Sequence, residues 1–191
     1  MTTSGAGSLP NVLTYARILA VPAVVACLYV SPDFTGRWWA LSIYLAACLT
    51  DWLDGYLARV WRQQSTLGRV LDPIADKLLV GATLLMLTHY NTIEGMQIWA
   101  AVIILCREIL VSGLREFLAE LNVKVHVTQL AKWKTTLQMI AVGVLLAGPA
   151  GDQIVPGVTF TGLVLLWIAA LLTLWTGFDY LKAAVRTAIE R

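Results

Sequence analysis

Four aspartates in the first half of the chain carry the strongest chemical signal. Two stand three residues apart and two stand four residues apart: Asp51 and Asp54, then Asp72 and Asp76. On a helix, each of these spacings places both carboxylates on one face. Carboxylate oxygens suit hard cations such as Mg²⁺ or Mn²⁺, and four of them can bridge two ions in a phosphoryl-transfer site. The sequence therefore predicts a site for two divalent cations.

Small residues accompany the first acidic pair. Positions 51, 54, 55 and 58 form one helical stripe that reads Asp, Asp, Gly, Ala. A stripe without bulky side chains lets a ligand approach the backbone closely. The second pair includes Asp72 directly before Pro73, which predicts either a helix N-cap and first residue or a local kink.

Other readings of the acids exist. Each aspartate could form an ion pair or a helix cap near a membrane surface, with Arg59 and Lys77 as partners for two of them. The four could also line a proton or cation pathway in a transporter. Acids in a membrane cost about 2.5–3.5 kcal/mol each at a helix centre, so four of them need a neutralising partner.

The composition is that of a membrane protein. Of 191 residues, 58% are hydrophobic and 14% are charged, whereas soluble domains carry about 25% charged residues. Six apolar stretches approach the length that crosses about 30 Å of hydrocarbon, at residues 12–30, 38–58, 71–90, 97–118, 134–149 and 158–178. Because backbone groups in lipid must satisfy one another, these stretches are expected to be helices. We expect an all-α polytopic protein with six transmembrane helices, forming a single domain over residues 1–191 with residues 1–8 mobile.

The basic residues predict the orientation. The loops after the second and fourth stretches, together with the C-terminal segment, hold nine of them: Arg59, Arg62, Arg69, Lys124, Lys132, Lys134, Lys182, Arg186 and Arg191. The opposite side holds only Arg37, so both termini are expected in the cytoplasm. Four more basic residues, Arg17, Lys77, Arg107 and Arg115, fall inside the apolar stretches. The net charge of +2 and the lack of a basic, aromatic-interleaved stretch exclude nucleic acid as a partner.

The acidic segment resembles the signature of the CDP-alcohol phosphotransferase family. It reads Asp51-x2-Asp54-Gly55-x2-Ala58-Arg59-x8-Gly68-x3-Asp72-x3-Asp76, with eight fixed positions across 26 residues. The resemblance implies six transmembrane helices, a polar active-site cavity facing the cytoplasm, two divalent cations and a homodimer. By position, it makes Asp51, Asp54 and Asp72 metal ligands, and Asp76 both a metal ligand and the general base. It assigns the CDP-binding site to Asp54, Gly55, Ala58, Arg59, Thr66 and Gly68.

Other segments resemble the branch of this family that transfers a phosphatidyl group from CDP-diacylglycerol to glycerol 3-phosphate, within a bacterial inner (cytoplasmic) membrane. These segments are 10–17, 107–116, 132–138 and 172–181. Related branches would use inositol phosphate, serine or phosphatidylglycerol as the acceptor.

A basic cluster supports an acceptor that carries a phosphate. The candidate donors to that phosphate are Arg107, Arg115, Lys132 and Lys134. The two lysines could instead anchor the helix ends at lipid headgroups. Arg107 could instead pair with Glu108 or Glu116, because a cation deep in a span needs an acid or a polar cavity.

Overall fold

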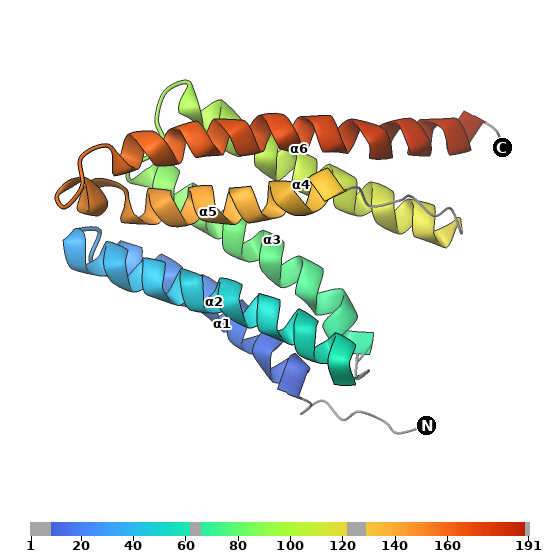
Figure 1. Ribbon diagram of the computed structural model, residues 1–191, viewed down its shortest axis with the longest axis horizontal. Coiled ribbons are helices and arrows are strands. Elements are labelled where there is room, and N and C mark those ends of the chain that lie inside the picture. Colours follow the sequence, from blue (N-terminus) through green and yellow to red (C-terminus); the bar gives the residue numbers. More distant parts are fainter. Residues whose placement is uncertain (1–8, 62–65, 122–128, 190–191) are drawn as a thin grey trace.

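The protein is described by a computed structural model over residues 9–61, 66–121 and 129–189 (Figure 1). These residues form six helices: α1 (Leu9–Val30), α2 (Phe34–Trp61), α3 (Thr66–His89), α4 (Gln97–Glu120), α5 (Gln129–Asp152) and α6 (Val158–Ile189). No strand occurs within the described ranges. The expected helix in each of the six apolar stretches is confirmed. Residues 1–8, which were expected to be mobile, lie outside the described residues.

Three helices contain segments that are long and apolar enough to cross a membrane by length and composition. Among the described residues these segments are Leu13–Val30 in α1, Gln97–Ala119 in α4 and Val158–Lys182 in α6. Helices α2, α3 and α5 are more polar, but each has at least 24 residues, which corresponds to a length of about 36 Å or more. The chain is an all-helical polytopic membrane protein, and six crossings remain the prediction.

The helices pack in two groups joined by α5. Helix α1 packs against α2 and α3, while α6 packs against α4 and α5. Both α2 and α3 also contact α5, and the helices run broadly along one axis (Figure 1). Tyr44, Leu84, Leu145 and Leu166 are fully buried between them. Large apolar side chains such as Trp175 face outward, as expected for helices that are surrounded by lipid.

A buried arginine fastens the end of the bundle where α1 meets α2. Arg37 donates to the hydroxyl of Thr92 at 2.7 Å and to the carbonyl of Pro32 at 3.2 Å. Helix α5 is kinked nearby at Gly148, whose φ is +34°. A side chain at Gly148 would place its Cβ 3.2 Å from the Arg37 guanidinium, so this close approach favours glycine.

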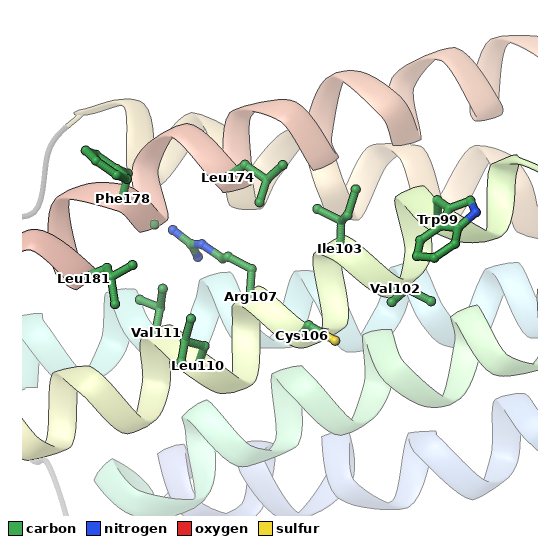
Figure 2. A pocket seen from close by; sticks show the side chains of 11 residues that line it. Trp99, Val102, Ile103, Cys106, Arg107, Leu110, Val111, Leu174, Phe178 and Leu181 are labelled. Carbon is green, nitrogen blue, oxygen red and sulfur yellow. The ribbon is translucent and has the colours of Figure 1, made fainter.

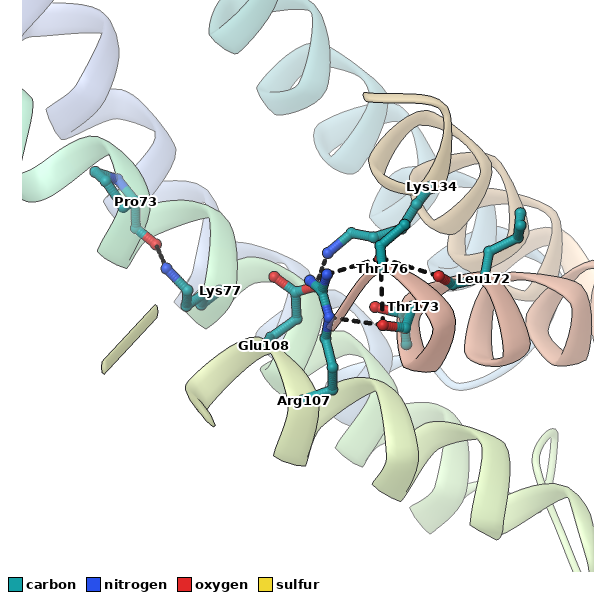
Figure 3. Close-up of polar contacts among 8 residues, drawn as sticks. All are labelled: Pro73, Lys77, Arg107, Glu108, Lys134, Leu172, Thr173 and Thr176. Atoms are coloured by element: carbon teal, nitrogen blue, oxygen red, sulfur yellow. Dashed lines mark hydrogen bonds and ion pairs between the residues drawn. The ribbon is translucent and has the colours of Figure 1, made fainter. Parts of the chain in front are cut away.

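Helix α3 does not begin at Asp72, although a helix N-cap was one of the two expectations for this residue. Helix α3 begins at Thr66, so Asp72 lies inside the helix and is not its N-cap. Pro73 is also internal, and it lacks the N–H that an internal helical residue normally donates. Lys77 donates to the carbonyl of Pro73 at 3.0 Å (Figure 3). The helix therefore continues through the proline and carries both Asp72 and Asp76 on one face.

Candidate active site

Helix α1 presents two polar side chains to the acidic face of α3. Thr14 and Arg17 are three residues apart, so they share a face of α1. Thr14 Oγ1 donates to Asp72 Oδ1 at 2.5 Å, and Arg17 Nη1 donates to Asp76 Oδ1 at 2.9 Å. Since Asp72 and Asp76 are one turn apart on α3, the two contacts repeat along the helix pair. This register orients both carboxylates from one side.

Arg17 also brings the acid of α2 to the same point. Its Nη1 atom lies 2.8 Å from Asp51 Oδ1 and 2.9 Å from Asp76 Oδ1. The arginine side chain is 1% exposed, whereas those of Asp51 and Asp76 are 32% and 36% exposed. The guanidinium of Arg17 is thus buried on the inner side of the cluster, and the two carboxylates remain partly accessible.

The donor set of this cluster suits a divalent cation. Asp51 and Asp76 offer carboxylate oxygens, the ligands that Mg²⁺ and Mn²⁺ prefer. The positively charged guanidinium of Arg17 lies against both of them and offsets part of their negative charge. Within the described part of the chain, no three His, Cys, Asp or Glu side chains form a ready metal cage. The side chain of Asp54, the fourth predicted ligand, lies outside the described residues.

The structure brings three of the four predicted metal ligands to one face of α1: Asp51, Asp72 and Asp76. All six predicted CDP-binding residues fall near the end of α2 or the start of α3, but their side chains lie outside the described residues: Asp54, Gly55, Ala58, Arg59, Thr66 and Gly68. The CDP site and the polar cavity facing the cytoplasm therefore remain predictions.

Arg17 is the residue of the candidate site that sequence reasoning missed. Its position inside an apolar stretch was a signal, because a buried cation needs an acidic or polar partner. The three-residue spacing to Thr14 was a second signal. Neither identifies the partner, because the side-by-side packing of α1 and α3 is a property of the whole fold.

A second charged cluster ties α4, α5 and α6 together (Figure 3). Arg107 Nη1 lies 3.0 Å from Glu108 Oε1, and Lys134 Nζ contacts the same carboxylate oxygen. Arg107 also donates to the carbonyl of Thr173 and the hydroxyl of Thr176, both at 2.8 Å. Gly177 makes room for this crossing, since a Cβ there would lie 3.1 Å from Arg107 Nε.

The predicted acceptor-phosphate residues are only partly together. Arg107 and Lys134 meet at Glu108, which confirms the alternative that Arg107 pairs with a neighbouring acid. Arg115 contacts neither of them in the described interactions; its guanidinium lies 5.7 Å from the ring centre of Tyr180. The side chain of Lys132 lies outside the described residues. A phosphate-binding role for these four residues remains a prediction.

An apolar groove lies between α4 and α6, with a cavity volume of about 370 Å³ (Figure 2). Its walls include Ile103, Leu110, Leu174 and Phe178, with Arg107 at its side. The Arg107 guanidinium is already bonded to Glu108, Thr173 and Thr176. This groove is distinct from the acidic cluster and differs from the predicted polar cavity in its apolar lining.

Comparison with known proteins identifies the family of the chain. The model of the CDP-alcohol phosphatidyltransferase family matches residues 7–175. The chain belongs to this family.

Individual relatives match over nearly the whole chain. A CDP-diacylglycerol–glycerol-3-phosphate 3-phosphatidyltransferase of Rickettsia bellii is 44% identical over 176 residues, spanning 92% of this chain and 94% of the relative. The protein of the same name in Cereibacter sphaeroides is 39% identical over 212 residues, spanning 93% of this chain and 96% of the relative. An Arabidopsis thaliana relative, CDP-diacylglycerol–glycerol-3-phosphate 3-phosphatidyltransferase 2, is 40% identical over 197 residues, with 96% and 82% covered.

Proposed function

We propose that this protein transfers a phosphatidyl group from CDP-diacylglycerol to glycerol 3-phosphate, giving phosphatidylglycerophosphate and CMP. The observation that carries the proposal is the meeting of Asp51 and Asp76, from two helices, at the Arg17 guanidinium. The relatives named for this reaction match more than nine-tenths of the chain. The enzyme acts in phospholipid synthesis within a bacterial cytoplasmic membrane, as a homodimer with both termini and the active site on the cytoplasmic side.

The chain's own side chains account for the proton and for the position of the attacking group. Asp76 accepts the proton of the acceptor hydroxyl, and Arg17 fixes the orientation of this carboxylate by donating a hydrogen bond to it. The freed oxygen attacks the phosphorus that bears diacylglycerol. The bond from that phosphorus to the CMP phosphate oxygen breaks, and CMP leaves with the electron pair.

Two divalent cations, Mg²⁺ or Mn²⁺, complete the proposed site. Asp51, Asp54, Asp72 and Asp76 would hold them, and when bound they supply positive charge that offsets the charge developing on the departing CMP. The exposure of Asp51 and Asp76 beside a buried arginine supports this assignment.

The acceptor is identified by offering purified protein labelled CDP-diacylglycerol with one alcohol at a time. We expect rapid CMP release and a phosphatidylglycerophosphate product with glycerol 3-phosphate, and at least tenfold slower release with serine, inositol phosphate or phosphatidylglycerol. Preference for another alcohol would place the protein in a different branch of the family. Cation flux in liposomes without CMP release would contradict the enzyme assignment.

Arg115 is expected to contribute to recognition of the acceptor phosphate. Replacing a charged donor costs about 1.5–3 kcal/mol, so Arg115→Ala should raise the KM for glycerol 3-phosphate roughly tenfold or more. The KM for CDP-diacylglycerol should change little. Tyr180→Leu removes the ring beside Arg115 but keeps the guanidinium, and serves as the matched control. Equal changes in both KM values for Arg115→Ala would count against the acceptor role.

A further inference from the structure

We propose that Arg17 sets the divalent-ion affinity of the acidic site by competing for the carboxylate oxygens of Asp51 and Asp76. The inference rests on the proposed function, because it concerns the ions expected at these aspartates. It assigns Arg17 as a positioning residue that acts through the two acids.

The contacts define the competition. One nitrogen of Arg17 lies within hydrogen-bond distance of Oδ1 of both Asp51 and Asp76. An ion that takes either oxygen must weaken a charge-assisted hydrogen bond, which is about twice as strong as a neutral one. The guanidinium is almost fully buried, so water replaces that bond poorly.

Electrostatic repulsion acts in the same direction. A fixed positive charge next to a carboxylate lowers the affinity of that carboxylate for a further cation. An arginine keeps its charge at every pH at which proteins function. Removing the charge therefore leaves the acids more attractive to a divalent ion, although it also removes the bridge between α2 and α3.

Other contacts hold the acids in place without this bridge. Thr14 still donates to Asp72, and α1 packs along both α2 and α3. The loss of competition should thus outweigh the loss of alignment. We expect Arg17→Gln to bind Mn²⁺ about tenfold more tightly than the wild-type protein. Arg17→Lys keeps the positive charge as a point charge that binds two carboxylates less well. The Mn²⁺ affinity of Arg17→Lys should therefore fall between those of the wild-type protein and Arg17→Gln.

The experiment titrates Mn²⁺ into the full-length protein in detergent micelles and measures free Mn²⁺ by electron paramagnetic resonance. A second readout is the unfolding temperature in EDTA and in excess Mn²⁺. Arg17→Gln should unfold at a lower temperature than wild type in EDTA, and Mn²⁺ should raise its unfolding temperature by more than it raises that of wild type. Arg37→Gln is the matched control: it removes another buried arginine, bonded to Thr92 and Pro32 and not to the acids. It should lower the unfolding temperature equally in both conditions and leave Mn²⁺ affinity unchanged.

The outcomes separate this inference from the proposed function. Tighter Mn²⁺ binding in the order Gln, Lys, Arg at position 17 supports the competition. If the wild-type protein binds Mn²⁺ and both Arg17 variants bind it with equal or weaker affinity, the competition is overturned and the metal site stands. If Arg17→Gln does not fold, the comparison of Arg17→Lys with wild type decides alone. Absence of Mn²⁺ binding in wild type and in every folded Arg17 variant would overturn both the metal site and the inference.

Discussion

Asp76→Asn is expected to reduce CMP release by at least about a thousandfold while CDP-diacylglycerol still binds. An amide cannot accept the proton of the acceptor hydroxyl, and general-base catalysis alone contributes about 10²–10⁴-fold. Asparagine also offers a neutral oxygen where a divalent cation would find a carboxylate. Turnover is measured as CMP release from labelled CDP-diacylglycerol, and binding is measured separately with the same lipid.

The loss should arise from chemistry, because the substitution preserves the shape of the site. Asparagine has the size of aspartate, and its carbonyl oxygen can still accept from Arg17, now 2.9 Å from Asp76. Asp152→Asn provides the control at the other end of the bundle, where Asp152 accepts from the backbone N–H of Thr159 at 3.1 Å. That variant should keep full activity. Near-normal turnover in Asp76→Asn would rule out Asp76 as the base.

The helices were predictable because membrane-length apolar runs leave the backbone few alternatives. The ends of the helices were less predictable. Helix α6 continues to Ile189, eleven residues beyond the expected span, and α3 begins at Thr66 before its first acid. Beyond the hydrocarbon no apolar pattern is required, so hydropathy does not mark where such a helix ends.

The acids of the site were predictable from spacing, and their partner was not. The four-residue step within one helix predicts a shared face for Asp72 and Asp76, and their contacts to α1 confirm it. Arg59 and Lys77, which are near in sequence, were named as possible ion-pair partners for two of the acids, and the side chain of Arg59 lies outside the described residues. The observed cation, Arg17, is 59 residues from Asp76, and only the packing of α1 against α3 brings the two together.

The same limit applies to the basic cluster. A cation inside a span needs a partner, and this requirement correctly predicted that Arg107 could pair with Glu108. It did not predict that Lys134 of α5 would share that carboxylate, or that Thr173 and Thr176 of α6 would complete the arginine's hydrogen bonds. Those contacts depend on how three helices pack.

Removal of divalent cations should have the second large effect. In excess EDTA we expect CMP release to fall to the background rate, and Mg²⁺ or Mn²⁺ added beyond the chelator should restore it. The carboxylates near Arg17 outnumber that one positive charge, and the diphosphate of CDP-diacylglycerol adds further negative charge to the same place. Without added cations, these groups repel one another and the leaving CMP has little to stabilise it. EDTA saturated beforehand with Mg²⁺ controls for effects of the chelator itself.

This experiment also separates the two main explanations of the acids. If they formed only structural ion pairs, Arg17 would satisfy Asp51 and Asp76 fully, and EDTA would leave CMP release unchanged. If they hold catalytic ions, activity must follow the free metal concentration, and Asp51→Asn should shift that dependence to higher concentrations by removing one charged ligand. A protein that releases CMP at an undiminished rate in EDTA, with no bound metal by elemental analysis, would contradict the catalytic-ion explanation. Arg17 would then be the only cation the acids require, and another source of leaving-group stabilisation would have to be sought among the basic residues of α4 and α5.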